Sequence, residues 1–224
     1  MIIEGLDQQS PEWLAMRVGM CTASRVADAI AKLKRKDGEA AKRRDYKWEL
    51  VLERLTGLTA EHFVSEPMKW GMDFEPLARK RYAQTIGEMV VPIGFAMHDR
   101  IKWFGASPDA LVGDEGLLEI KCPTPETHLE YILNGVMPEQ YVPQVLAELS
   151  CSGRQWADFV SFDPRLPDNL QLFMVRVQRD EAKIAELEAD VEQFLAEVKE
   201  ITDRLKAGGS IEAALKESVK LAKV

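Results

Sequence analysis

The chain has 224 residues, of which 46% are hydrophobic and 29% charged, and its formal net charge is −8 at pH 7. This length suits one compact domain with a substantial core, since single domains can run to roughly 200–250 residues. The apolar runs are far shorter than the roughly 20 residues needed to cross a bilayer, and the first residues lack the basic start and apolar core of a signal peptide. We therefore expect a cytoplasmic protein with a single domain over 1–224, in which 179–224 forms a C-terminal helical extension.

Cysteine and histidine give no sign of a zinc site or a disulfide framework. The three cysteines are odd in number, widely spaced and free of any C-x-x-C pair. The three histidines are scattered, which favours surface or turn positions over metal ligation. These residues are Cys21, Cys122, Cys151, His62, His98 and His128.

The negative net charge disfavours a nucleic-acid partner, but the charge is unevenly distributed. Residues 32–48 carry eight basic and three acidic side chains, a local charge of +5, which leaves −13 for the rest of the chain. Such a basic arm could follow a phosphate backbone, and a solvated loop with incidental charge would explain the composition equally well. The basic residues are Lys32, Lys34, Arg35, Lys36, Lys42, Arg43, Arg44 and Lys47.

Four helices are expected before residue 88. Serine followed by proline is a typical helix start, and glycine often follows the last turn of a helix. The basic arm between the second and third helices is expected to be partly mobile. The predicted helices run over about 10–17, from Thr22 or Ser24 to 33, over 46–55 and over 68–86.

The middle of the chain is rich in short strand-like segments, and the last segment is an amphipathic helix. Strands are predicted over 89–97, 102–105, 110–112, 117–121, 156–161 and 170–177, with helices over 126–134 and 139–151. From Ile184 to Leu205 apolar residues recur every three or four positions, and a short helical tail is expected over 211–224. This order predicts an α/β or α+β fold with a central mixed sheet and helices on both sides.

Two acids and a lysine stand out in the strand-rich region. Alternate residues of a strand share a face, so Glu119 and Lys121 should project together while Ile120 points into the core. A hairpin would bring Asp109 close to Glu119. Two carboxylates suit Mg²⁺, a hard cation, and the backbone carbonyl of Ile120 could be a further ligand. The neighbouring lysine could orient a metal-bound water and stabilise charge on a phosphate.

Spacing alone supports this interpretation only weakly. Glu-x-Lys is common on amphipathic strands as a simple charge pair, and Pro-Asp is a common turn dipeptide. Two observations strengthen it. The charges end an apolar strand over 117–122, where burial is costly without a partner. The helix over 70–82 carries Glu75, which is either an exposed helix acid or a third carboxylate of the site.

Six short blocks, in order over residues 10–180, resemble the phage λ-type exonucleases, or YqaJ-like viral recombinases, of the PD-(D/E)xK nuclease superfamily. The resemblance implies a restriction-endonuclease-like core. The blocks are Trp13-Leu14-Ala15-Met16-Arg17-Val18-Gly19 with Thr22-Ala23-Ser24; Trp70-Gly71 with Phe74-Glu75; Ser107-Pro108-Asp109-Ala110-Leu111; Leu118-Glu119-Ile120-Lys121-Cys122-Pro123; Tyr141-Val142-Pro143-Gln144-Val145; and Phe162-Asp163-Pro164-Arg165. The basic arm differs in detail from the family, and the tail beyond Leu205 is unmatched.

The resemblance implies a metal-dependent deoxyribonuclease acting on linear double-stranded DNA. It would use Mg²⁺, with Mn²⁺ as a substitute, and prefer a 5′-phosphorylated end. It would degrade the 5′-ended strand 5′→3′, release mononucleotides and leave a 3′ single-stranded overhang for recombination by strand annealing. By matching position, Glu75, Asp109, Glu119 and the Ile120 carbonyl would hold the metal, and Lys121 would position the attacking water.

Four matched residues fall where the family binds the 5′-phosphate: Arg17, Ser24, Ser107 and Gln144. The role suits them, since arginine offers a fork of donors, hydroxyl and amide groups complete a cradle, and a helix start favours an anion. Without the resemblance, Arg17 would be a surface cation and Gln144 a solvated helix residue. Met68 falls near the position where the family inserts an apolar side chain to split the terminal base pair of the DNA. Alternatively, Met68 is an ordinary core methionine.

The resemblance also implies a homotrimeric ring around DNA and a single-strand annealing recombinase as partner. In such a ring the outside can be acidic while basic arms line the channel. Two alternatives remain open at this stage. One is a structure- or site-specific endonuclease of the same superfamily, which would need no 5′-phosphate pocket. The other is a non-catalytic DNA-binding or assembly subunit, which would have no reason to keep clustered acids near phosphate.

Overall fold

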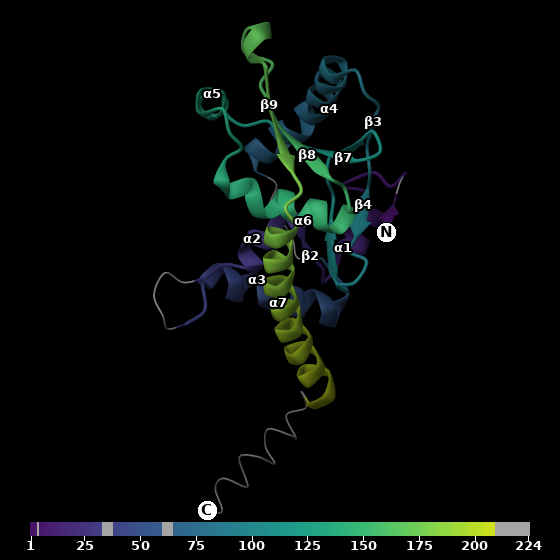
Figure 1. The fold of residues 1–224 in the computed structure, drawn as a ribbon. Coiled ribbons are helices and arrows are strands. Elements are labelled where there is room, and N and C mark those ends of the chain that lie inside the picture. Colours follow the sequence, from purple (N-terminus) through teal and green to yellow (C-terminus); the bar gives the residue numbers. More distant parts are fainter. Residues whose placement is uncertain (4, 33–37, 60–64, 209–224) are drawn as a thin grey trace, which may run out of the picture.

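The computed structural model describes residues 1–3, 5–32, 38–59 and 65–208, and its strands form two mixed sheets flanked by helices (Figure 1). The five-stranded sheet has the order β3-β6-β7-β8-β9, and the four-stranded sheet has the order β1-β4-β5-β2. The pairs β7–β8 and β2–β5 are parallel and the other pairs antiparallel. The strands are β1 (Ile2–Ile3), β2 (Cys21–Thr22), β3 (Val90–Val91), β4 (Phe95–Met97), β5 (Phe104–Ala106), β6 (Ala110–Val112), β7 (Gly116–Lys121), β8 (Trp156–Phe162) and β9 (Leu172–Gln178).

Seven α-helices surround the sheets in the described residues, with short 3-10 turns at Ala23–Arg25, Glu139–Tyr141 and Asp168–Leu170. Glycine ends α3 and α4 as expected, because Gly57 and Gly87 adopt the left-handed conformation that the cap requires. No helix among these is long and apolar enough to cross a membrane. The helices are α1 (Pro11–Arg17), α2 (Val26–Ala29), α3 (Ala41–Thr56), α4 (Glu66–Ile86), α5 (Pro125–Asn134), α6 (Val142–Ser152) and α7 (Glu181–Gly208).

Strand β7 is buried on both faces and separates two hydrophobic cores. Leu117 belongs to the larger core, with the apolar residues of α6 and α7. Leu118 and Ile120 belong to the smaller core, with Tyr82 of α4 and Val160 of β8. Successive residues of β7 therefore contribute to opposite cores, as the two-residue period of a strand requires. The prediction that Ile120 points into the core is confirmed, since its exposed fraction is 6%.

Several elements differ from the sequence-based expectation. The strand predicted over 89–97 is two short strands that pair in different sheets, and Pro92 between them has no amide to donate to a ladder. The second helix is only four residues long. Helix α3 begins at Ala41, so part of the expected mobile arm is helical. The predicted tail over 211–224 lies outside the described residues.

Two histidines are buried, which corrects the expectation of a surface position, although His98 lies in the turn region between β4 and β5; His128 lies in α5. His98 is 8% exposed and His128 is fully buried. The ring of His128 bonds to Ser161 Oγ at 2.6 Å and to the Leu170 carbonyl at 2.8 Å, which ties α5 to the sheet. His62 falls outside the part of the chain that the structure describes.

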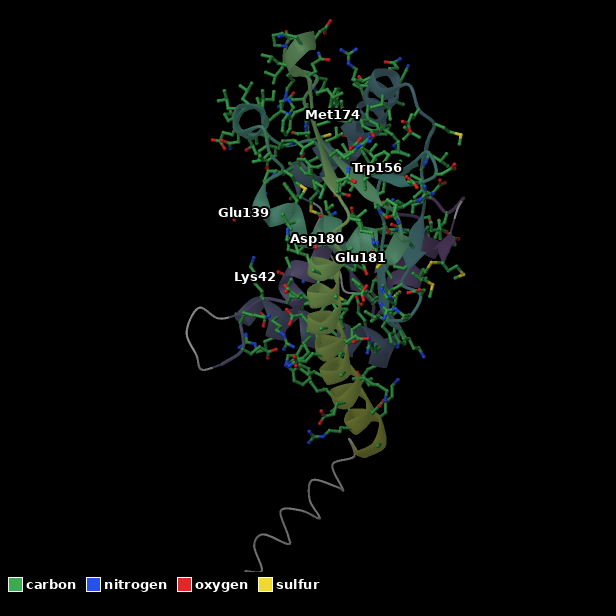
Figure 2. All side chains as sticks on the ribbon, viewed as in Figure 1. Lys42, Glu139, Trp156, Met174, Asp180 and Glu181 are labelled. Atoms are coloured by element: carbon green, nitrogen blue, oxygen red, sulfur yellow. The ribbon has the colours of Figure 1, made fainter. Side chains whose placement is uncertain are left out.

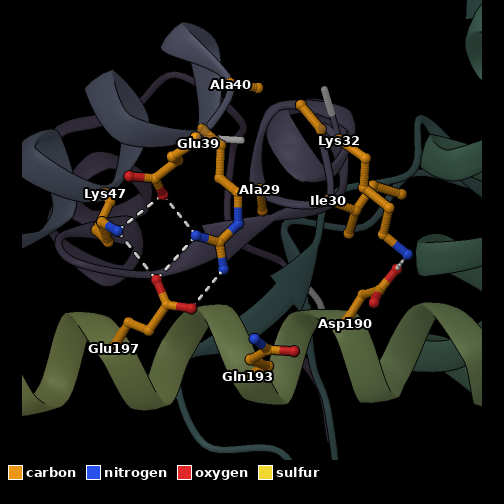
Figure 3. A pocket seen from close by; sticks show the side chains of 12 residues that line it. Ala29, Ile30, Lys32, Glu39, Ala40, Lys47, Asp190, Gln193 and Glu197 are labelled. Atoms are coloured by element: carbon orange, nitrogen blue, oxygen red, sulfur yellow. Dashed lines mark hydrogen bonds and ion pairs between the residues drawn. The ribbon is translucent and has the colours of Figure 1, made fainter. Parts of the chain in front are cut away.

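Helix α7 starts at Glu181, just after Asp180 and β9, and packs along α3 and α6 (Figures 1 and 2). The contact with α3 includes a cluster of four charges (Figure 3). The guanidinium of Arg43 donates to both oxygens of Glu197 at 2.8 and 2.7 Å. Lys47 Nζ donates to Glu197 at 2.9 Å and to Glu39 at 2.7 Å.

This cluster occupies part of the basic arm. Arg43 and Lys47 have side chains only 16% and 12% exposed and are already paired with acids, so they do not form a free basic surface. Lys32 pairs with Asp190 of α7 at 2.8 Å. Lys42 is exposed at the start of α3 (Figure 2). Residues 33–37 of the arm lie outside the described residues.

We expect Glu197→Gln to lower the free energy of unfolding by about 1 kcal/mol at pH 7, because charge-assisted hydrogen bonds join two helices here. Hydrogen bonds from Arg43 lower the pKa of Glu197 from 4.5 to about 2. The contribution is therefore present above pH 4.5 and lost as the pH falls toward 2. Chemical denaturation at pH 7 and near pH 3 measures it. An equal effect of Glu192→Gln, an exposed acid of the same helix, would contradict the assignment.

Candidate active site

Asp109 and Glu119 lie on neighbouring strands of the β6–β7 hairpin, which the sequence predicted. The register pairs Ala110 with Leu118, so Asp109, just before β6, is opposite Glu119. The backbone amide of Asp109 donates to the Leu118 carbonyl at 3.0 Å. The Asp109 carboxylate in turn accepts from the amide of Ile120 at 2.5 Å. The half-buried acid thus extends the ladder of hydrogen bonds one residue before the start of β6.

Lys121 and Glu119 form an ion pair on one face of β7. The distance from Lys121 Nζ to Glu119 Oε1 is 2.5 Å, and the side chains are 26% and 3% exposed. Burial disfavours the charged amine, but the attraction of Glu119 and Asp109 outweighs burial and raises the pKa of Lys121. The ammonium also lies 5.1 Å from the ring centroid of Tyr141. Lys121 is therefore a fixed cation at neutral pH.

Two further acids come from the helices on either side of the sheet. Glu75 of α4 accepts from Arg79 at 2.7 Å. Burial raises the pKa of Glu75, Arg79 opposes the rise, and the charge of Glu119 adds to it. Glu148 of α6 is 1% exposed, and burial together with the charge of Glu119 holds its pKa well above the usual range. The pKa of Asp109 is raised in the same way, first by burial and then by Glu119 and Glu75.

Glu148 was missed in the sequence interpretation, although the sequence contains a signal. The acid lies within the apolar run Val145-Leu146-Ala147-Glu148-Leu149, where a solvated helix would place no charge. It also follows Gln144 by four residues, a spacing that puts both side chains on one helix face.

Gln144 lies among these carboxylates. Its Nε2 donates to Glu119 Oε1 at 2.5 Å and to Glu148 Oε1 at 2.9 Å. Its Oε1 accepts from Lys121 Nζ at 3.4 Å. The amide therefore connects the acids of two elements with the lysine.

Arg17 and Ser107 meet in a second group of polar side chains. Arg17 donates to Ser107 Oγ at 3.2 Å, and Trp13 Nε1 donates to the same oxygen at 3.0 Å. The guanidinium carbon of Arg17 lies 3.9 Å from the Trp13 ring centroid. Burial lowers the pKa of Arg17 to about 10, which leaves it charged at neutral pH. Ser107 precedes Asp109 by two residues, so this group adjoins the acids along the chain.

The other predicted site residues are placed differently. Ser24 is exposed in the 3-10 turn, and its hydroxyl lies 3.4 Å from that of Thr22. Met68 is 52% exposed in the first turn of α4. Cys122 follows Lys121 and is half-buried; burial and the charges of Glu75 and Asp109 raise the pKa of its thiol to about 12. The thiol is thus neutral at ordinary pH and is a weak nucleophile.

The charges of the acidic cluster do not balance. Asp109, Glu119, Glu75 and Glu148 are four carboxylates, and the cations that pair with them in the described part of the chain are Lys121 and Arg79. No three Asp, Glu, His or Cys side chains of that part are gathered closely enough to hold a metal ion as they lie. The donors still fit a hard divalent cation, because carboxylate oxygens are its preferred ligands and the mutual repulsion of the acids would be relieved.

Comparison with known proteins identifies a family and several solved structures that the chain resembles. A family model described as the YqaJ-like viral recombinase domain matches residues 12–155. Two crystal structures of LHK-Exo, an alkaline exonuclease from Laribacter hongkongensis, are 44% identical to the chain. They cover 95% of this chain and 100% of their own, with TM-scores of 0.82 (the complex with dAMP) and 0.81.

A more distant structure shares the fold. A phage-related exonuclease from Haemophilus somnus 129PT is 18% identical and superimposes with a TM-score of 0.60, over 85% of this chain and 96% of its own. No curated protein matches the chain at a significant level.

We expect Asp109→Asn to raise the free energy of unfolding by about 1 kcal/mol at pH 8 in chelating buffer, because it removes a carboxylate that the fold destabilises. Asparagine still offers an oxygen to the Ile120 amide. The raised pKa of Asp109 means that this position loses stability as the pH rises above 3.8. The gain should therefore be small near pH 4 and grow with pH.

Denaturant unfolding across this pH range measures the effect. Asp114→Asn, at the exposed tip of the same hairpin, is the matched control. A gain that is equal in both variants, or independent of pH, would contradict the crowding of the acids.

Proposed function

The chain belongs to the family of YqaJ-like viral recombinase domains, and from this premise we propose that it is a DNA exonuclease whose active centre is Asp109, Glu119 and Lys121. One observation carries the proposal: a half-buried lysine and two acids meet across the β6–β7 hairpin. An idle binding module gains nothing from such crowding. The 44% identity to an alkaline exonuclease over nearly the whole chain gives further support.

The proposed reaction is hydrolysis of a phosphodiester bond with Mg²⁺, or Mn²⁺ in its place. Glu75, Asp109, Glu119 and the Ile120 carbonyl would hold the cation. When bound, it would supply a Lewis acid to the phosphate and lower the pKa of water. Lys121 would hold the attacking water and stabilise the charge that grows on the phosphate oxygens. Its amine is suited to this because its raised pKa keeps it charged.

The polarity of the proposed reaction is 5′→3′, with a 5′-phosphate held by Arg17 and Ser107. Arg17 remains charged although half-buried, and its guanidinium lies over the Trp13 ring. An end bound there would lie beside Asp109, which suits removal of one nucleotide at a time and leaves a 3′ overhang. Ser24 and Gln144 are proposed to complete the pocket, and without DNA their side chains contact Thr22 and the residues Glu119, Glu148 and Lys121, respectively. Met68 is sufficiently exposed to act as an apolar wedge.

The family likeness supports two further proposals. The first is a homotrimeric ring around the DNA. The second is an annealing recombinase that takes over the 3′ overhang. Both concern assembly, and neither is needed for the chemistry at Asp109 and Lys121.

We expect Lys121→Met to lower the rate of nucleotide release from a linear 5′-phosphorylated duplex with Mg²⁺ by about 100-fold or more, since a fixed charge at the reacting phosphate is lost. Affinity for the duplex, measured by anisotropy, should stay within about threefold. Lys199→Met, an exposed lysine of α7, should leave the rate unchanged.

The substrates in this assay separate the possible activities. Release from linear DNA with closed circles left intact supports the exonuclease. Cutting of closed circles would indicate an endonuclease, and binding without cleavage under any Mg²⁺ or Mn²⁺ concentration would indicate a non-catalytic subunit.

We expect Arg17→Met to reduce the preference for a 5′-phosphorylated over a 5′-hydroxyl duplex by about tenfold, because a charge-assisted fork to phosphate is removed. The rate on the 5′-hydroxyl duplex should change little. Paired rate measurements on the two substrates give the ratio, and Arg204→Met on the exposed end of α7 is the control. An unaltered ratio in Arg17→Met would remove this residue from the 5′-phosphate pocket.

A further inference from the structure

Glu148 is a buried carboxylate that is not among the proposed metal ligands and has no role in the proposed catalytic step. It lies on α6 at 1% exposure, among residues of the larger core. One of its oxygens, Oε1, accepts from Gln144 at 2.9 Å. The other, Oε2, is buried and has no hydrogen-bond partner among the described residues.

Folding alone does not account for an acid at this position. Burying a carboxylate costs free energy, and an oxygen without a partner adds to that cost. An apolar side chain of similar size would fill the same space within α6 and leave no polar group unpaired. Glu148 also lies against Glu119, whose negative charge repels its own, so its favourable hydrogen bond is the one to Gln144 and its benefit passes through that amide.

The contacts of Gln144 depend on which way its amide faces. Its nitrogen donates to both Glu119 and Glu148, and its oxygen faces Lys121. If the amide turned over, its oxygen would face two carboxylates and its nitrogen would face an ammonium. Glu148 therefore helps to fix the amide in the one orientation that is compatible with Glu119 and Lys121 together.

We propose that Glu148 is a positioning residue of the active centre, which orients Gln144 so that Gln144 holds Glu119 and Lys121 in their paired geometry. The proposal rests on the proposed nuclease function. It also assigns Gln144 a second role. Besides the expected contact with a 5′-phosphate, Gln144 orients Glu119 and Lys121. Glu148 itself touches no reacting atom in this scheme.

Two substitutions of nearly equal size test the proposal. Glu148→Met removes the acceptor and keeps an unbranched side chain that adapts to a core. Glu148→Gln keeps an oxygen that can accept from Gln144. We expect Glu148→Met to lower kcat by about tenfold with KM for duplex DNA within about twofold, the effect of one lost hydrogen bond in a charged network. Glu148→Gln should restore kcat to within about threefold of wild type.

A double substitution tests the route of the effect. If Glu148 acts through Gln144, then Gln144→Met with Glu148→Met should be no slower than Gln144→Met alone. Losses that multiply would overturn the proposal. The Mg²⁺ concentration for half-maximal rate should be unchanged in Glu148→Gln, and a large increase would make Glu148 a metal ligand instead.

Stability separates positioning from support of the fold. Glu148→Met should melt at or above the wild-type temperature, because an unpaired buried oxygen is removed. A lower melting temperature, with activity reduced only in proportion to the folded fraction, would make the role structural. Asp158→Asn is the matched control, since Asp158 is 3% exposed and bonds to Tyr82 and Arg176 outside the active centre. That variant should lose stability and keep kcat.

A measurement without DNA or metal distinguishes failure of this proposal from failure of the proposed function. The side-chain amide signals of Gln144, identified by their loss in Gln144→Met, are followed by NMR in chelating buffer. They should be shifted downfield in wild type and in Glu148→Gln, and move toward those of a solvated glutamine in Glu148→Met. Unmoved signals in Glu148→Met would overturn the proposal. A wild-type protein that cleaves no DNA would overturn the function and leave this contact measurable.

Discussion

Repulsion among carboxylates is the constraint that governs the end of β7. Asp109 and Glu119 are placed across a hairpin by backbone register, and Glu75 and Glu148 approach from helices on opposite sides. Such a cluster persists in a fold only when cations and hydrogen-bond donors offset it. Lys121 and Arg79 offset part of it, and burial together with the remaining repulsion raises the pKa of Asp109 and of Glu75.

The burial of β7 makes this constraint unavoidable. A strand with cores on both faces has no solvated side for charged residues, so Glu119 and Lys121 must satisfy each other and their neighbours. The surrounding helices respond accordingly. Helix α6 carries Gln144 to the pair, and α4 carries Glu75 with its own partner Arg79. The strong core around β7 thus holds a cluster that would be unstable on a loop.

The hairpin acids and Lys121 could be predicted because they depend on local rules, the strand period and a tight turn. The family resemblance extended the prediction to Arg17 and Ser107, which do meet in the structure. What escaped prediction depends on tertiary contacts. The two-residue strands β1 and β2 are too short for any period to show. The contact between Glu148 and the active-site residues depends on how α6 packs against the sheet. Part of the basic arm is neutralised by acids of α7 that are distant in sequence.

Helix α6 serves two purposes along one stretch of chain. Its residues Val145, Leu146 and Leu149 fill the larger core, and Gln144 and Glu148 on the same turns face the acids. A substitution that shifts this helix alters packing and chemistry together, so selection cannot adjust one without the other. The polar group at Arg17, on a short helix with no buried residue, is under no such restriction. Under the proposed function, substitutions at the Arg17 group could alter how the DNA end is bound without disturbing the acids and lysine that α6 supports.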